Sequence, residues 1–134
     1  MIDASVALKW FLKEEGTEEA LRILDELTSF IAPDLIFREM HAVLTKRVRM
    51  NYLDLDEAIA INETDAGRLP CKHPLRIRID AFAFELASTI PITLYDACYL
   101  ALAIEFGTLL YTSDRKLVNG LKNTPFESVS RLIR

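Results

Sequence analysis

Cysteine, glycine and long apolar runs are all scarce in this sequence. The two cysteines, Cys71 and Cys98, are too few for a disulfide framework and are typical of reduced, buried residues in a cytosolic protein. The longest stretch without charge, Leu86 to Tyr95, has ten residues, whereas a membrane-spanning helix needs roughly 20. Asp3 and Lys9 interrupt the apolar N-terminus, so no signal peptide is expected. The sequence predicts a cytoplasmic protein without a membrane segment.

Several common active-site motifs are also missing. The four glycines form neither a dinucleotide-binding pattern nor a phosphate loop, and no nucleophile elbow occurs. Cys71 and His73 make a C-x-H pair, but His41 is the only other histidine, so a zinc site is not expected. Neither histidine has a sequence context that indicates a catalytic triad. We expect His41 to be an ordinary surface or packing residue.

Composition sets the size and class of the protein. The chain has 16 basic and 20 acidic residues and a net charge of −4, which argues against coating nucleic acid by bulk electrostatics but does not exclude a nuclease. A length of 134 residues with 51% apolar content is enough for one compact domain with its own core. We therefore expect a single domain that spans residues 1–134 and carries one site.

Short apolar runs alternate with amphipathic stretches. Strands are expected at residues 1–3, 30–32, 69–73, 109–111 and 127–129, and helices at residues 6–12, 17–27, 33–48, 54–67, 93–106 and 115–121. Residues 76–86 are ambiguous, because they begin with strand-like alternation and continue with helical spacing; we predict a helix. The alternation predicts an α/β fold, with a central, mostly parallel sheet flanked by helices and a ligand crevice at the carboxyl ends of the strands.

Four carboxylates stand at positions where a charge is normally costly. Asp3 and Asp114 end short apolar runs, Asp96 lies in the first turn of an expected helix, and Glu39 falls on the buried stripe of another. A buried charge costs free energy unless something pairs with it. If the four acids converge on one cleft, a divalent cation is the partner that this set would need.

Each acid also has a purely structural interpretation. Asp3 and Asp114 could cap the helices that follow them, and Asp96 has capping-box spacing with the threonine three residues before it. Glu39 could belong to a buried ion pair, with Lys46 or an arginine as its partner. These interpretations and the metal site both remain open at this point.

Basic residues occur near the acids and at the end of the third helix. Lys46, Arg47 and Arg49 either complement the dipole of a helix C-terminus or bind phosphate. The candidates that lie closest in sequence to the acids, and that we expect to contact backbone phosphates, are Lys9, Arg38, Arg115 and Lys116.

Four motifs in order along the chain resemble those of the PIN-domain ribonucleases, and the VapC toxins of toxin–antitoxin pairs in particular. They are Ile2-Asp3-Ala4-Ser5, Pro33-Asp34 leading into Glu39, Thr93-x-Tyr95-Asp96-Ala97-Cys98-Tyr99-Leu100-Ala101, and Thr112-Ser113-Asp114-Arg115. Each motif alone is weak, but the ordered set covers essentially the whole chain and is fairly specific. The resemblance implies a PIN-like fold.

The resemblance also implies a site and partners. Asp3, Glu39, Asp96 and Asp114 map onto the acidic quartet of the family, and Ser5 and Thr112 map onto polar positions that support it. One position departs from the pattern, because Ala42 stands where family members often carry Asn, which puts a secondary contact in doubt. RNA as substrate, a small antitoxin as inhibitor and a homodimer are further implications.

The hypothesis that follows is a metal-dependent endoribonuclease. The four acids would hold one or two Mg²⁺ or Mn²⁺ ions, which activate water and offset charge during hydrolysis of an RNA phosphodiester. A receiver-like phosphoacceptor domain is a weaker alternative, because Asp3 has no acidic neighbour. A catalytically silent PIN-like module that only binds a partner or RNA is the other alternative, and a nuclease assay with and without EDTA separates it from the enzyme.

The third and fourth expected helices carry more apolar residues than one small sheet can cover. Among them are Phe37, Met40, Tyr52 and Ile61. A face made of such residues is expected to remain for a partner chain, so the sequence predicts a dimer or a larger assembly.

Overall fold

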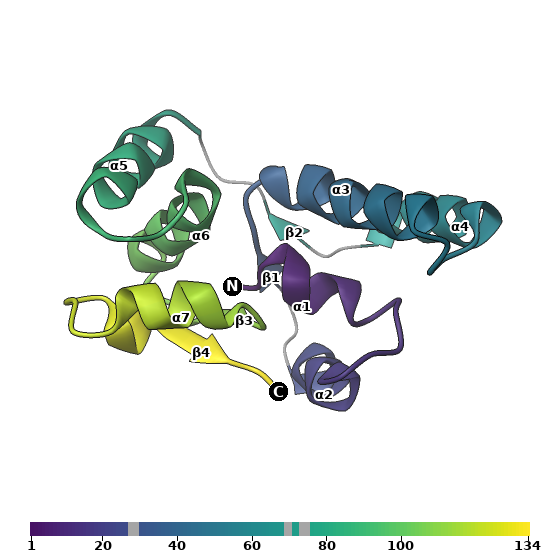
Figure 1. The fold of residues 1–134 in the computed structure, drawn as a ribbon. Coiled ribbons are helices and arrows are strands. Elements are labelled where there is room, and N and C mark those ends of the chain that lie inside the picture. Colours follow the sequence, from purple (N-terminus) through teal and green to yellow (C-terminus); the bar gives the residue numbers. More distant parts are fainter. Residues whose placement is uncertain (27–29, 69–70, 73–75) are drawn as a thin grey trace.

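The computed structural model describes residues 1–26, 30–68, 71–72 and 76–134, and the side chains of residues 64–79 are left undescribed. Helices and short strands alternate along the chain (Figure 1). The helices are α1 (Ala4–Leu8), α2 (Thr17–Glu26), α3 (Leu35–Arg49), α4 (Leu55–Arg68), α5 (Arg76–Thr89), α6 (Leu94–Glu105), α7 (Arg115–Leu121) and the 3₁₀ turn Glu127–Val129. The strands are β1 (Phe30–Ile31), β2 (Cys71–Lys72), β3 (Leu110–Thr112) and β4 (Ser130–Leu132).

The strands pair in parallel, as the α/β prediction requires. Phe30 of β1 lies opposite Cys71 of β2, and Leu110 of β3 lies opposite Ser130 of β4. The N-terminus joins β3 through a parallel bridge between Ile2 and Tyr111. Each ladder among the described residues is two or three residues long, so helix packing contributes most of the tertiary contact.

Most predicted elements lie within a few residues of their expected places. The ambiguous residues 76–86 are helical, as predicted, and the first helix begins earlier than expected, at Ala4. The final strand was predicted wrongly, because residues 127–129 form a 3₁₀ turn and the strand follows at Ser130. Its register is fixed by pairing with β3, which local sequence does not encode. Part of the strand expected at 69–73 lies outside the described residues, as does His73.

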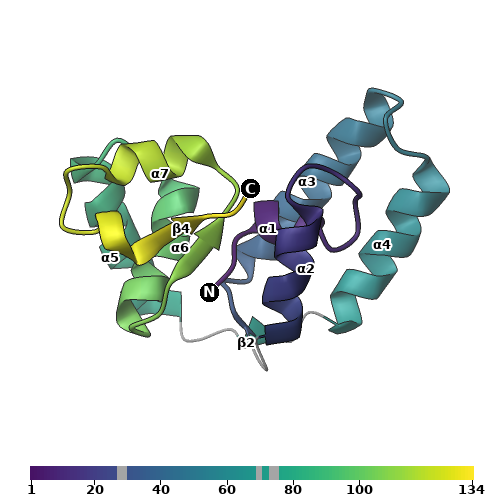
Figure 2. The ribbon, with the colours of Figure 1, turned by 90° about the horizontal axis from the view of Figure 1, so that it is seen from below.

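The helices form two groups that meet around the N-terminus (Figure 2). One group contains α1 to α4, and the other contains α5, α6 and α7 with β3 and β4. Helix α6 lies at the centre of its group, and six of its twelve residues are buried. It ends in a Schellman motif at Gly107, where φ is 59° and the Thr108 N–H donates to the carbonyl of Ala103 at 2.9 Å. The second group therefore contributes a helix with one well-buried side to the junction.

Two further sequence predictions concern single residues. Cys98 is a free, partly buried thiol, and His41 is exposed, in line with its expected surface role. Among the described residues, no single helix is long and apolar enough to cross a membrane. Within the same residues, the segments Asp80–Thr89 and Leu94–Glu105 reach the required length and apolar content only when taken together, and a bend of 118° separates them.

Candidate active site

A cleft of about 410 Å³ lies where the two helix groups meet, and all four suspect carboxylates line it. They come from four separate elements. Asp3 precedes α1, Glu39 lies within α3, Asp96 is in the first turn of α6, and Asp114 precedes α7. The fold thus collects acids that are separated by as many as 111 residues, counted from position 3 to position 114. We call this feature the acidic cleft.

The capping interpretations are correct, and they do not compete with the cleft. The Asp3 carboxylate accepts from the Val6 N–H at 3.1 Å and from the Ser5 hydroxyl at 2.6 Å. Asp114 accepts from the Lys116 N–H at 2.7 Å. An ionised carboxylate has about four acceptor positions, so each cap leaves capacity for another ligand. Capping fixes where these two side chains lie.

The expected capping box at the start of α6 is also present. The Asp96 N–H donates to the Thr93 hydroxyl oxygen at 3.1 Å, while the Thr93 N–H and hydroxyl donate to the Asp96 carboxylate at 3.3 and 2.7 Å. The side chain of Asp96 is thereby drawn back toward the helix start. It still lines the acidic cleft.

Glu39 forms a hydrogen bond with a tyrosine, whereas a buried ion pair would require a lysine or an arginine. The Tyr99 hydroxyl donates to Glu39 Oε2 at 2.5 Å, which links α3 to α6 across the cleft. Tyr99 is 2% exposed, and its burial, reinforced by the charge of Glu39, raises the pKa of the phenol, so it stays a donor. Lys46, one of the cations considered as a partner for Glu39, is exposed. No local pattern predicts this hydrogen bond, because it depends on packing between two helices.

Burial and mutual repulsion both act on the acids. Burial raises the pKa of Asp3 most, and the charge of Asp96 raises it further. The pKa of Glu39 is raised first by burial and then by the charges of Asp3 and Asp96. For Asp96 the same burial effect is largest, with a contribution from Asp114. Asp3, Glu39 and Asp96 therefore each have a pKa that is raised by the charge of another acid of the cleft.

The donor chemistry of this group suits a hard divalent cation, because all four side chains offer carboxylate oxygens and repel one another without a counter-charge. Within the described part of the chain, however, no three His, Cys, Asp or Glu side chains meet closely enough to hold a metal ion. The hydrogen bonds to Thr93 and Tyr99 occupy two of the four carboxylates. The acids share a cleft without forming a closed coordination shell.

Hydroxyl groups of Ser5 and Thr112 form hydrogen bonds next to the acids. Ser5 donates to Asp3 and accepts from the Ser113 N–H at 2.8 Å, so it joins α1 to the end of β3. The fully buried Thr112 accepts from the Asp114 N–H at 2.9 Å and lowers the pKa of Asp3 through a hydrogen bond. The Ser113 hydroxyl is buried in the described structure without a hydrogen-bond partner, and Ser113 lines the acidic cleft.

The predicted phosphate contacts divide into two kinds. Lys9 lines the acidic cleft but is 7% exposed, and its ammonium lies 3.1 Å from Glu14 Oε1 and donates to the Glu15 carbonyl. Arg38, Arg115 and Lys116 are exposed and are absent from the cleft lining. The exposed Ala42 does not line the cleft either. Of the four candidates for phosphate contact, Lys9 alone is part of the cleft lining, and the other three remain predictions.

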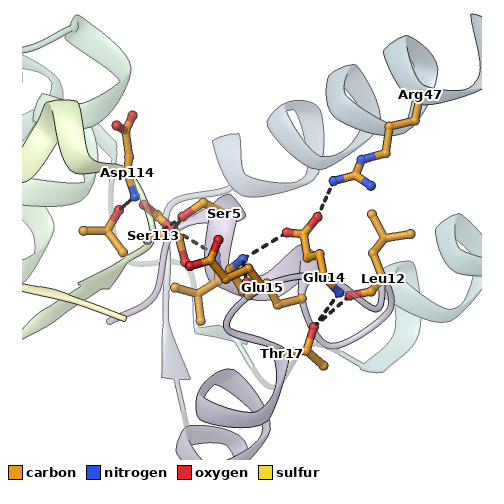
Figure 3. A network of polar contacts seen from close by, with 12 residues as sticks. Ser5, Leu12, Glu14, Glu15, Thr17, Arg47, Ser113 and Asp114 are labelled. Carbon is orange, nitrogen blue, oxygen red and sulfur yellow. Dashed lines mark hydrogen bonds and ion pairs between the residues drawn. The ribbon is translucent and has the colours of Figure 1, made fainter. Parts of the chain in front are cut away.

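Among the residues of the cleft that were not predicted, Glu14 is the charged one. Glu14, in the loop between α1 and α2, lines the cleft and pairs with Lys9 and with Arg47 of α3 (Figure 3). The loop is fixed at its base, where the Thr17 hydroxyl accepts from the Glu14 N–H at 2.9 Å and donates to the Leu12 carbonyl at 3.1 Å. No pattern in the sequence marks Glu14, because a lone acid in a loop is usually solvated.

Comparison with known proteins gives this arrangement a class. Residues 1–120 match the model of the PIN domain, so the chain belongs to the PIN-domain family. A relative, Ribonuclease VapC3 of Pyrobaculum aerophilum, is 33% identical over 120 residues, which cover 87% of this chain and 90% of the relative. The chain is thus a VapC-type member of the family, and the PIN-like α/β fold and the resemblance inferred from its four motifs are confirmed.

Proposed function

We propose that this chain is the toxin of a toxin–antitoxin pair, acting in the cytoplasm as a metal-dependent endoribonuclease that hydrolyses RNA phosphodiester bonds. One observation carries the proposal: a member of this family gathers four carboxylates from four elements in a single cleft. The name of its relative, Ribonuclease VapC3, supports the same activity. The free-energy cost of burying carboxylates in such a cleft is lowest when a cation offsets their charge.

Asp3, Glu39, Asp96 and Asp114 would hold Mg²⁺ or Mn²⁺. When bound, the ion lowers the pKa of a bound water and offsets the charge that develops on the phosphate. The protein supplies the positions of the oxygens. Helix capping fixes Asp3 and Asp114, and a change of partner at Thr93 and Tyr99 would free Asp96 and Glu39 for the ion.

The surrounding side chains keep the acids in place. The hydroxyl of Ser5 holds Asp3 against the end of β3, and the hydroxyl of Thr112 holds the backbone of Asp114. Tyr99 remains a neutral donor, because burial raises its pKa. Positioned oxygens lose little entropy when the cation arrives, so these contacts should favour metal binding.

A second surface supports the proposed protein partners, a small antitoxin and a second copy of the chain. Apolar and polar side chains of α3 and α4 line a groove of about 300 Å³, which we call the apolar groove. Leu55 and Ile59 of its lining are 57% and 45% exposed, and the neighbouring Tyr52 is 73% exposed. The prediction of a partner face was wrong for Met40, which is fully buried in the core. Met40 lies on the buried stripe of α3 and packs into the core, so it is not exposed to a partner.

The alternative of a catalytically silent binding module has one observation in its favour: in the described structure, no three metal-ligating side chains lie close enough to hold an ion. An assay of RNA cleavage separates the two functions. The wild type should cleave single-stranded RNA with Mg²⁺ or Mn²⁺, stop in EDTA and recover when Mg²⁺ is restored.

A matched pair of variants tests the site. Glu39→Gln should abolish cleavage, whereas Glu57→Gln, an exposed glutamate of α4 outside the cleft, should leave it unchanged. Cleavage that persists in EDTA, or in Glu39→Gln, would exclude the proposed catalytic site. RNA binding without cleavage under every metal condition would establish the silent module.

A further inference from the structure

The acidic cleft continues past the carboxylates toward the end of α3. Glu39, Val43 and Arg47 line it at intervals of four residues, on one face of the helix. At 1.5 Å per residue, Arg47 lies about 12 Å along the helix axis from Glu39. The cleft therefore has an acidic end and, some two helical turns away, a basic end.

Two cations are present in the described lining of this cleft, and they differ in accessibility. The side chain of Lys9 is 9% exposed, and its ammonium is shared by Glu14 and the Glu15 carbonyl. The side chain of Arg47 is 35% exposed and contacts Glu14 through Nη2. A guanidinium has five N–H donors in a planar fork, so a single contact leaves several of them for another anion.

We propose that Arg47 binds a backbone phosphate of the RNA, flanking the phosphate that is cleaved, and that Glu14 is a positioning residue for its guanidinium. This inference rests on the proposed ribonuclease function. Because Arg47 lies two helical turns from Glu39, about 12 Å along the helix axis, its guanidinium is placed for a phosphate next to the one at the acids. A guanidinium fork matches a phosphate in a bidentate manner, and Arg47 faces along the same cleft.

The competing explanation assigns Arg47 only to stability. A cation in the last turn of α3 favours the helix dipole, and the contact with Glu14 ties the loop before α2 to α3 (Figure 3). The dipole does not require Arg47 in particular, because Lys46 and Arg49 lie in the same turn. Neither of them lines the acidic cleft, and Arg49 lines the apolar groove instead.

Binding of a fluorescein-labelled single-stranded RNA, measured by anisotropy in EDTA, tests the role of Arg47 without any cleavage. Arg47→Gln should weaken binding about fivefold to tenfold, as expected for one charge-assisted phosphate contact. The slope of log K against log salt, between about 50 and 200 mM, should fall by about 0.7. The matched control is Lys46→Gln, which removes one positive charge from the same helix turn at an exposed residue that lines neither the acidic cleft nor the apolar groove, and which should leave the slope unchanged.

Glu14→Gln gives a result of the opposite sign. The carboxylate of Glu14 offsets the charges of both Lys9 and Arg47, so its neutralisation should tighten RNA binding, while the amide oxygen still accepts from the guanidinium. A purely structural contact predicts that both Glu14→Gln and Arg47→Gln lower the melting temperature and that neither changes RNA affinity. Opposite shifts in affinity therefore support the proposal, and unchanged affinity overturns it.

Two further measurements keep the test decisive. If Arg47→Gln melts too low for binding to be measured, Arg47→Lys keeps the charge and should retain the salt slope while losing part of the affinity, because the fork is gone. In cleavage assays with Mg²⁺, Arg47→Gln should raise KM more than it lowers kcat. Equal losses of affinity in Arg47→Gln and Lys46→Gln would mean that RNA is attracted by bulk electrostatics alone, and would overturn the proposal. A wild type that binds RNA without cleaving it defeats the ribonuclease assignment alone.

Discussion

Opposite faces of helix α3 line two very different hollows. One face lines the acidic cleft with Glu39, Val43 and Arg47, and the other lines the apolar groove with His41, Leu44, Thr45 and Val48. In the cleft, burial and repulsion raise the pKa values of Asp3, Glu39 and Asp96. In the groove, large apolar side chains remain in water. Both are unfavourable in the isolated chain, so each is a place where a ligand can stabilise the protein: a cation in the first, an apolar partner in the second.

The largest expected effect comes from removing one charge at the acidic end. Asp96→Asn should lower RNA cleavage by more than about a hundredfold, because metal stabilisation of the transition state amounts to several kcal/mol. The same substitution should raise the melting temperature in EDTA, since it removes a buried, repelled charge. Asn caps about as well as Asp, so the capping box should survive.

Melting curves with and without Mg²⁺ supply the check on Asp96. Mg²⁺ should stabilise the wild type by roughly 2.7 kcal/mol at a hundredfold excess over its dissociation constant, and should stabilise the variant much less. Asp56→Asn, at an exposed acid of α4, is the control and should behave as wild type. Equal Mg²⁺ shifts with retained cleavage would mean that Asp96 is only a cap.

The acids could be predicted from sequence because their signals are local. Asp3, Asp96 and Asp114 lie at the starts of helices. A helix start can be recognised from the residue type and from polar residues no more than three positions away. Glu39 stood out by the periodicity of α3. The parallel pairing of the strands followed from the alternation of elements, since a helical crossover joins parallel neighbours.

The features that sequence did not predict depend on contacts between distant segments. The bond from Tyr99 to Glu39 joins residues 60 positions apart, and the Glu14 contact with Arg47 joins residues 33 positions apart. The displacement of the last strand to Ser130 follows from its register with β3. Local propensity contains no information on these pairs. The basic end of the cleft, where Arg47 contacts Glu14, can therefore be identified only from the three-dimensional structure.

A substitution in the apolar groove should separate partner binding from catalysis. Ile59→Glu places a charge where an apolar partner would bury it, and should weaken self-association by about tenfold to a hundredfold. Cleavage by the variant should remain, because Ile59 does not line the acidic cleft. Light scattering over a concentration series at micromolar protein measures the effect.

The control for this surface is Leu21→Glu on α2, which has a similar exposure of 41% against 45% for Ile59. It should leave the assembly unchanged. A wild type that is monomeric and binds no antitoxin-like peptide would contradict the assignment of the groove. Equal losses from both substitutions would point to general charge repulsion.

A smaller effect is expected in the pH dependence of the metal-free protein. Because the folded-state pKa of Asp96 is raised, the folded state binds more protons than the unfolded state above about pH 4. Its contribution to stability is therefore lost as pH rises through the folded pKa. The gain in stability of Asp96→Asn over wild type, measured by denaturation in EDTA, should grow from pH 4 to pH 7. A constant difference would mean that the carboxylate is not perturbed.

The smallest expected effect tests the buried hydroxyl at the junction of the two helix groups. Ser113 Oγ has no partner in the described structure, whereas the backbone N–H of Ser113 donates to Ser5 Oγ. Ser113→Ala removes an unsatisfied polar atom and should stabilise the metal-free protein by about 1 kcal/mol. Ser5→Ala removes a hydroxyl of similar size but leaves both Asp3 Oδ1 and the Ser113 N–H without that partner, so it should destabilise the protein.

Urea denaturation of both variants in EDTA measures whether each substitution raises or lowers the free energy of unfolding. Destabilisation by Ser113→Ala would mean that its hydroxyl is already hydrogen-bonded in the metal-free cleft, for example to water, and would remove one reason to regard this end of the cleft as built for an oxygen-rich ligand.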